Sequence, residues 1–585
     1  MRIFTLFFAA CLPAQEPRRE TIVVTATYEP LALEEIDRSV TVLPARDLAL
    51  VSNTLVDLLR LDSSLDLRQR APNGLQSDLS IRGSTFGQTL VLLNGQRLND
   101  AQSGHHNMDI PTPLEAVSRI EVLRGAGSTF YGSDAIGGAI NILTEPPELP
   151  EIRLRAAAGS HGVNQQRGSV AFHLGELREH LTFSRDFSSG FRPNRDYRNL
   201  SLASSTYYRS TTAILAWNDR PFGADRFYGN FNSWEDTKTW FASLRQGLGA
   251  KTQAGFAWRR HSDLFVLYRD RPQVFANHHA SETWQASLRR REPLGKTATL
   301  YFGGEGYQDS IRSNNLGRHA RGRAAAYGSL DLRALRRFSL SLGAREEVYG
   351  SLASQLSPSL AAGVWLTSRV KVRGSVSRAF RVPTYTDLYY HDPANLGSPD
   401  LRPERAWSQE AGIDWNSGGV FRAAATLFHR REQDVIDYIR RSPSDIWRAT
   451  NVHRIRFTGI EATAGVRAGR SQQLDFRYTG LNGAQNAIPG VLSKYVFNYP
   501  SHSGVASWHG TLAKGLLART RVGALNRRAR DPYALWDIYL ASTRGRFRPF
   551  AQFTNLTATV YEEIPGVVMP GRAVVGGIEI LLQRR

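Results

Sequence analysis

The sequence contains a single cysteine in 585 residues, Cys11, within the N-terminal segment MRIFTLFFAACLPAQ. A basic start, an apolar stretch and small residues before a polar stretch are typical of a secretory signal peptide over residues 1–15. The order FAAC faintly resembles a lipoprotein processing site, but Phe8 is a poor residue at that place before the cysteine. Whether Cys11 is removed or lipidated, the mature chain has no free thiol, which excludes disulfides and thiolate metal sites.

Long hydrophobic runs and catalytic motifs are also absent. No run of about 18 apolar residues occurs, so a helical membrane span is excluded, whereas the alternating strands of a transmembrane barrel leave only a weak hydropathy pattern. The mean hydropathy is -0.34. The sequence has no G-x-S-x-G, no H-E-x-x-H and no Walker-type glycine–lysine loop. We therefore predict that the chain is not an enzyme and carries no cofactor.

Acidic residues are few relative to basic ones. There are 53 against 73, only six of the 73 are lysine, and the net charge is +20. This excess predicts an anionic partner, either lipopolysaccharide phosphates in an outer membrane or a negatively charged ligand. A general arginine-rich composition explains the excess equally well. Nucleic acid is not predicted as a partner, because the arginines are spread through strand-like segments rather than gathered in one stripe.

Residues 31–147 have the mixed pattern of a small α+β domain. The run SNTLVDLLRLD at 52–62 predicts a helix capped by Ser52 or Asn53. Three short apolar strands follow, LSIRG (79–83), TLVLLNGQRL (89–98) and SRIEVLRG (118–125), and the dipeptide NG at 94–95 indicates a hairpin turn in the second. The glycine-dense SDAIGG at 133–138 predicts a backbone that turns left-handed or lies close to another segment.

Residues 148–585 alternate with period two almost throughout. In TWQASLRR, one face carries Trp284, Ala286 and Leu288, and the other carries Gln285, Ser287 and Arg289. The length accommodates about 20–22 strands, and closing so many strands into a barrel removes the exposed edges of an open sheet. A soluble propeller or a row of sandwiches is the alternative, but no repeat of about 40–50 residues supports it.

Four stretches, in order along the chain, resemble TonB-dependent outer-membrane receptors, in particular the cobalamin and siderophore receptors. They are ETIVVTATYEP (20–30), SIRGSTFGQTLVLLNGQRLND with SRIEVLRGAGSTFYGSDAIGGAINILT (80–144), SRAFRVPTYTDLYY with LGSPDLRPERAWSQEAGIDW (377–415), and FTNLTATVYEEIPGVVMPGR (553–572). The resemblance covers essentially the whole chain.

This resemblance implies a membrane all-β fold: a 22-stranded transmembrane antiparallel β-barrel over 148–585 with an N-terminal α+β plug domain over 31–147 inside its lumen. The implied protein is a monomer in the outer membrane of a Gram-negative-type bacterium. SDAIGG would lie where the last strand of the plug runs down the barrel wall toward the periplasm. The chain ends GGIEILLQRR without the terminal aromatic residue usual in the family, which leaves open how efficiently the last strand is assembled.

A plugged barrel without a nucleotide site needs energy through contact with a partner, and the resemblance implies that this partner is TonB. The segment 16–30 carries the TonB box, a short apolar stretch suited to adding itself as an edge strand to another sheet. The predicted TonB-interacting residues are Glu20, Thr21, Ile22, Val23, Val24, Thr25 and Ala26. An ordinary N-terminal strand of the plug is the alternative interpretation.

Two further sets of residues follow from the resemblance. Arg82, Glu121 and Arg124 match plug residues that form a charged cluster against barrel carboxylates, although plain plug stability explains them equally well. The outward loops of the plug and barrel give the candidate ligand-binding residues Gln76, Asp78, His105, His106, Asn107 and His391. Since adjacent histidines on a strand point to opposite faces, we predict no metal site from His105 and His106.

The ligand predicted from the charge and the family is a ferric siderophore, imported actively. Cobalamin and haem stay open as alternatives; the short basic NRDYRN (194–199) differs from the acidic loops of some cobalamin receptors, and His391 lies in the interval where haem receptors carry a histidine. A passive porin is the alternative of a different class. A signalling transducer is not expected, because such receptors place a further domain ahead of the box.

Overall fold

The computed structural model describes residues 21–583 except Ala26, Arg336, Ser351, Arg470, residues 486–489 and Ala529. The predicted signal peptide, Cys11 and Glu20 therefore lie outside the described residues, as does Ala26 within the box. Among the described residues, no helix is long and apolar enough to cross a membrane.

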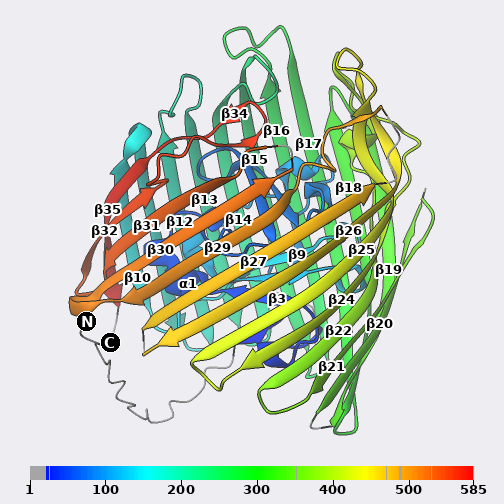
Figure 1. Ribbon diagram of the computed structural model, residues 1–585, viewed down its shortest axis with the longest axis vertical. Coiled ribbons are helices and arrows are strands. Elements are labelled where there is room, and N and C mark those ends of the chain that lie inside the picture. The colour runs from blue at the N-terminus through cyan, green and yellow to red at the C-terminus, as the bar shows by residue number, and fades with distance from the viewer. Residues whose placement is uncertain are drawn as a thin grey trace, which may run out of the picture.

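A closed antiparallel barrel of 22 long strands forms the body of the molecule (Figure 1), which confirms the predicted fold class. The strands are β10 Glu151–Gly159, β11 Val163–Leu174, β12 Leu177–Ser188, β13 Tyr197–Tyr208, β14 Thr211–Asp225, β15 Asn232–Leu248, β16 Thr252–Val266, β17 Ala276–Leu294, β18 Ala298–Ser313, β19 Gly317–Leu335, β20 Phe338–Tyr349, β21 Gln355–Trp365, β22 Val370–Arg381, β24 Glu404–Asn416, β25 Phe421–Arg440, β26 Trp447–Ala468, β27 Gln472–Gln485, β29 Pro500–Thr511, β30 Leu516–Arg527, β31 Tyr533–Ser542, β32 Phe547–Thr554 and β35 Ala573–Gln583. The barrel closes where β35 pairs with both β32 and β10.

The period-two pattern places apolar side chains outside and polar side chains inside. On β17, Trp284 and Leu288 are 46% and 52% exposed, whereas Gln285 between them is buried against the plug. The last strand follows the same rule, with Ile578 and Leu582 outward and Glu579 inward. An apolar outer surface and a polar lumen are what a barrel in lipid requires.

The plug fills the lumen with a five-stranded sheet in the order β3-β8-β9-β6-β7 and a separate β4–β5 hairpin. Its elements are β1 Ile22–Val23, β2 Leu31–Ala32, β3 Val40–Leu43, α1 Ala45–Leu48, α2 Leu55–Leu59, β4 Leu65–Ala71, β5 Leu75–Ile81, β6 Thr89–Leu93, β7 Gln96–Arg97, β8 Val117–Arg124, α3 Ser128–Tyr131 and β9 Gly138–Thr144. The predicted NG hairpin is present, with Asn94 and Gly95 both at positive φ between β6 and β7.

Two local predictions differ from the structure. Helix α2 is shorter than predicted and is capped by Thr54, whose hydroxyl accepts from the backbone N–H of Asp57. Ser52, Asn53 and Thr54 can all cap a helix, and the structure uses the third, so the helix starts later than predicted. Strand β9, which follows SDAIGG, does not run along the barrel wall but lies in the middle of the plug sheet between β8 and β6. At Gly138, φ is +145° and an added Cβ would lie 2.0 Å from the Leu123 carbonyl oxygen, so a tight approach of β8 requires glycine.

Candidate functional site

The two ends of the barrel differ in the length of their connections. At one end Arg209 and Ser210 alone join β13 to β14, whereas at the other residues 382–403, which contain α4 Tyr385–Tyr389 and β23 Asn395–Leu396, join β22 to β24. The long connections stand at the top of Figure 1 and the short turns at the bottom. Outer-membrane barrels have short periplasmic turns and long extracellular loops, so the top is extracellular and the end with the short turns is periplasmic.

The box segment is the predicted TonB box, residues 20–26, of which the structure describes residues 21–25; this described part is folded against the plug at the periplasmic end. β1 pairs with β2 over two residues, Ile22 opposite Ala32 and Val23 opposite Leu31. The backbone N–H groups of Val24 and Thr25 both donate to Glu121 Oε2, at 3.0 and 2.8 Å. Val23 and Thr25 are fully buried. In this state the strand edge is already used, so the segment has to leave the plug before it can pair with another protein.

A cavity of about 370 Å³ lies beside the box segment, between the plug and the inner wall of the barrel. Val24 and Tyr28 line it on the plug side, and Arg289, Glu305 and Tyr327 line it from strands β17–β19. Tyr28 stacks on Tyr327 at 5.4 Å between ring centroids. This cavity shows that the plug does not pack tightly against strands β17–β19 of the barrel wall.

Arg82 forms a charged cluster with two barrel carboxylates. Its guanidinium donates twice to Glu461 on β26, at 2.7 Å each, and once to Glu410 on β24, at 2.9 Å. Arg82 has a φ of +51°, unusual for a residue with a side chain, and this strained backbone is held by the surrounding fold. Arg124 adjoins the cluster, 3.5 Å from Glu461 and 3.6 Å from Asp62.

Glu121, predicted to join that cluster, lies elsewhere. Its carboxylate accepts from the box backbone and pairs with Arg119 at 2.9 Å. The reason is the pleat of β8: Glu121 is fully buried on the side of the sheet that the box segment covers, and Arg124, three residues later, is on the opposite side.

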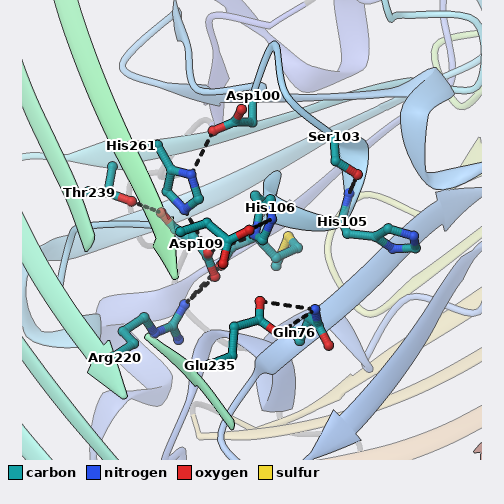
Figure 2. A network of polar contacts seen from close by, with 12 residues as sticks. Gln76, Asp100, Ser103, His105, His106, Asp109, Arg220, Glu235, Thr239 and His261 are labelled. Atoms are coloured by element: carbon teal, nitrogen blue, oxygen red, sulfur yellow. Dashed lines mark hydrogen bonds and ion pairs between the residues drawn. The ribbon is translucent and has the colours of Figure 1, made fainter. Parts of the chain in front are cut away.

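At the extracellular end, the plug loop 99–111 meets strands β14–β16 in a buried polar network (Figure 2). Asp109 Oδ2 lies 3.3 Å from His106 Nδ1 and 3.1 Å from His261 Nε2 on β16. Asp109 Oδ1 accepts from Arg220 on β14 at 3.0 Å. Burial lowers the pKa of His106, but its hydrogen bonds with Asp109 and Asp263 raise the pKa by more, so that it lies well above 6.5. The site therefore favours a positive charge on or beside this imidazole.

The predicted ligand-binding residues are mostly engaged within the protein. Gln76 donates to Glu235 at 3.2 Å, Asp78 pairs with His105 at 2.6 Å, and Asn107 accepts from the Asp100 N–H at 3.0 Å, all three side chains being buried. His105 and His106 do not lie on a strand, as the prediction assumed, but in a 3-10 turn, Gly104–His106; Figure 2 shows their rings pointing apart.

His391 does not join the other candidates. It is exposed in the connection between β22 and β24, where its backbone carbonyl accepts from Asn315 at 2.7 Å. Within the described residues it makes no hydrogen bond or ion pair with His105 or His106.

An extracellular group that the sequence did not reveal lies above the plug; we call it the aromatic–cation patch. Its members are Phe86, His105, Tyr438, Arg440, Trp447, Lys494 and Tyr495. Phe86 stacks on His105 at 4.1 Å between ring centroids, and Tyr495 meets Phe86 edge-on at 5.1 Å. Lys494 is 5.4 Å from the Tyr438 ring, and all but Tyr438 are at least partly exposed.

The patch was missed because its parts come from two plug turns, from the facing ends of strands β25 and β26, and from the connection between β27 and β29. The only available pattern was the pairing of basic and aromatic residues in turn-like runs such as IRRSPSDIWR (439–448). Such runs are common in solvated loops, so they identify a binding surface only once the fold brings them together.

Comparison with known proteins identifies the family to which this architecture belongs. Residues 164–561 match the family model described as TonB dependent receptor-like, beta-barrel, and residues 32–139 match the TonB-dependent Receptor Plug Domain. The chain is a TonB-dependent receptor. Members of this family are receptors and transporters of the outer membrane, so the predictions of the family, the location and a role other than catalysis are confirmed. The passive porin is not supported.

Relatives with assigned names agree with the family. This receptor is 26% identical over 538 residues to the iron-regulated outer membrane virulence protein of Vibrio cholerae, covering 82% of this chain and 81% of that one. It is 25% identical over 501 residues to the vitamin B12 transporter of Photobacterium profundum, covering 78% and 79%. Among solved structures, the ferric enterobactin receptor of Pseudomonas aeruginosa superposes with a TM-score of 0.77 at 16% identity, covering 96% and 100%, which shows the shared fold.

Proposed function

We propose that this receptor binds an anionic ferric siderophore at its extracellular face and imports it into the periplasm with energy delivered by TonB. The observation that carries the proposal is the aromatic–cation patch. Lys494 and Arg440 supply positive charge, and Trp447, Tyr495 and Phe86 supply ring faces that suit an anionic chelate with aromatic groups. The iron-regulated relative from Vibrio cholerae supports an iron ligand.

TonB is proposed to engage the box segment, residues 20–26, by strand addition after Val24 and Thr25 leave Glu121. The cavity beside Tyr28 separates the plug from strands β17–β19, so the plug has the fewest contacts to break along this part of the barrel wall. Contact with lipopolysaccharide and a monomeric state stay predictions from the sequence.

Direct binding to a panel of ligands tests the proposal. The purified receptor in detergent is titrated with a ferric catecholate, a ferric hydroxamate, haem and cobalamin, and binding is followed by quenching of its eleven tryptophans. We expect saturable binding of an anionic ferric chelate. Binding of cobalamin alone would instead support the second candidate, which the 25% identical vitamin B12 transporter favours.

A further inference from the structure

Two histidines and an aspartate converge where the plug meets β16. The donor atoms are His106 Nδ1 and Asp109 Oδ2 from the plug loop and His261 Nε2 from the barrel. The aspartate oxygen lies 3.3 and 3.1 Å from the two nitrogens, and the three atoms are within 4.8 Å of one another. Ligands about 2.0–2.1 Å from a tetrahedral ion are separated by about 3.3 Å, so both separations from the aspartate oxygen fit one shared ion.

The outer nitrogens of both histidines face carboxylates. His261 Nδ1 lies 3.0 Å from Asp100 Oδ2, and His106 Nε2 lies 3.4 Å from Asp263 Oδ2. Carboxylates close to the outer nitrogens are common in the outer shell of metal-binding imidazoles, where the inner nitrogen is the ligand. All five side chains are buried.

The network contains more buried carboxylates than arginines, which favours binding of a cation. Four buried carboxylates, on Asp100, Asp109, Glu235 and Asp263, surround the histidines, and Arg220 and Arg259 pair with two of them. The carboxylates outnumber these arginines by two, and this surplus of acidic groups attracts a cation to the two imidazoles. Buried acceptors also lack partners: within the described residues, Asp263 Oδ1 and Gln102 Oε1 have no hydrogen-bond donor.

We propose that His106, Asp109 and His261 bind one divalent first-row transition-metal ion, with Zn²⁺ the best fit, and that this ion fastens the plug to strand β16. Two imidazoles and a carboxylate suit Zn²⁺, whereas Ca²⁺ and Mg²⁺ prefer sites made only of oxygen. Asp263 lies beside the outer nitrogen of His106, so it orients this ring and is not itself a ligand of the proposed ion. The proposal does not depend on the identity of the imported chelate.

The test uses the full chain in detergent, stripped with a chelator and titrated with Zn²⁺ by calorimetry and with Co²⁺ by visible absorption. We expect one equivalent of Zn²⁺, a Co²⁺ ligand-field spectrum, no binding of Ca²⁺ and a higher unfolding temperature with Zn²⁺. His261→Gln is expected to weaken Zn²⁺ binding at least 100-fold. His180→Gln, a buried inward histidine on β12, is the matched control and should leave binding unchanged.

Loss of Zn²⁺ binding in His261→Gln could also result from misfolding, so a second variant, His261→Cys, provides a positive spectroscopic result. The only cysteine of the sequence is Cys11, in the predicted signal peptide, so a thiolate-to-cobalt charge-transfer band in this variant would place the ion at position 261 directly. Absence of stoichiometric Zn²⁺ and Co²⁺ binding by the natural chain would overturn the proposal. So would equal Zn²⁺ affinity in the natural chain and His261→Gln.

Discussion

The two ends of the plug are attached to their surroundings in different ways. At the periplasmic end, the box segment is held by a two-residue strand pair and by two N–H groups on one carboxylate, that of Glu121. At the extracellular end, Asp109 and His106 contact Arg220, His261 and Asp263 on strands β14 and β16, all of them buried. In between, Arg82 is held by two barrel carboxylates.

This contrast indicates how a plugged barrel responds to a pull. A few backbone contacts at an end are broken one after another, whereas buried ion pairs separate only at a large cost because each partner is left without compensation. The periplasmic end can therefore detach while the rest of the plug stays in place. The predictions below test this difference, beginning with the largest expected effect.

Val23→Pro is expected to abolish uptake and leave surface binding of the ligand unchanged. Proline removes a backbone donor that an added strand needs, and the box has no role at the extracellular face. Uptake of a radiolabelled chelate by whole cells and binding to de-energised cells measure the two steps. Val23→Ile is the control and should transport normally; full transport by the proline variant would refute the role of the box.

Arg82→Ala is expected to destabilise the plug within the barrel by about 3–5 kcal/mol, because Glu410 and Glu461 are left buried without a cation. Hydrogen exchange of plug amides, followed by mass spectrometry, reports the loss of protection. The control Arg209→Ala removes an exposed pair with Glu176 and should change little. Equal protection in both variants would contradict the charged cluster as an attachment.

Glu121→Ala is expected to free the box segment without loosening the plug. Two backbone donors lose an ionised acceptor, and hydrogen bonds to charged groups are worth about 1.5–3 kcal/mol each. A spin label on Thr21→Cys should become mobile in this variant. Glu145→Ala, which removes the other partner of Arg119, is the control. A label that is equally immobile in both would show that Glu121 does not hold the box.

Acid is expected to weaken the plug–barrel contact made by Asp62. Burial raises the pKa of this carboxyl, but Arg124 and Arg477, together with hydrogen bonds from Ser64, lower it to about 2. Because the unfolded value is about 3.9, the charged group adds about 2 kcal/mol above pH 4, and this is lost as the pH falls toward 2. The stability difference from Asp62→Asn should shrink over that range; a constant difference would be inconsistent with the shift.

Lys494→Gln is expected to weaken binding of an anionic ferric chelate about tenfold, with a smaller effect at high salt. Tryptophan quenching at two salt concentrations measures it. Lys514→Gln, on a periplasmic turn, is the matched control. An effect of equal size in both variants would indicate general electrostatics rather than the aromatic–cation patch.

The barrel was predictable from the sequence to a large extent. Alternation such as Trp284-Gln285-Ala286 identifies both faces of a strand, because a pleated strand exposes successive side chains to lipid and lumen. The NG hairpin and strand β8 were predictable for the same local reason. The cap of α2 was not, since Ser52, Asn53 and Thr54 are all good caps and tertiary packing selects among them.

The sites were predictable only in part. The pairing of Arg82 with barrel carboxylates agrees with the expectation, but Glu121 is placed by the pleat on the other side of the sheet. His105 and His106 were visible as a pair, yet the partner of His106 is His261, on another strand. No local pattern joins residues so far apart along the chain.

By itself, the sequence determined a mixed N-terminal region followed by a long series of alternating strands, because periodicity and turn chemistry are local properties read along one strand or one turn. The plug and the box were expectations from the resemblance to the receptor family. Only the tertiary structure decided which charges meet. Seating the plug inside the barrel brings Asp109 to His261, Arg82 to Glu461 and His105 to Tyr495. Such contacts depend on the rotation and depth of one domain within another, which side-chain packing over the whole interface sets.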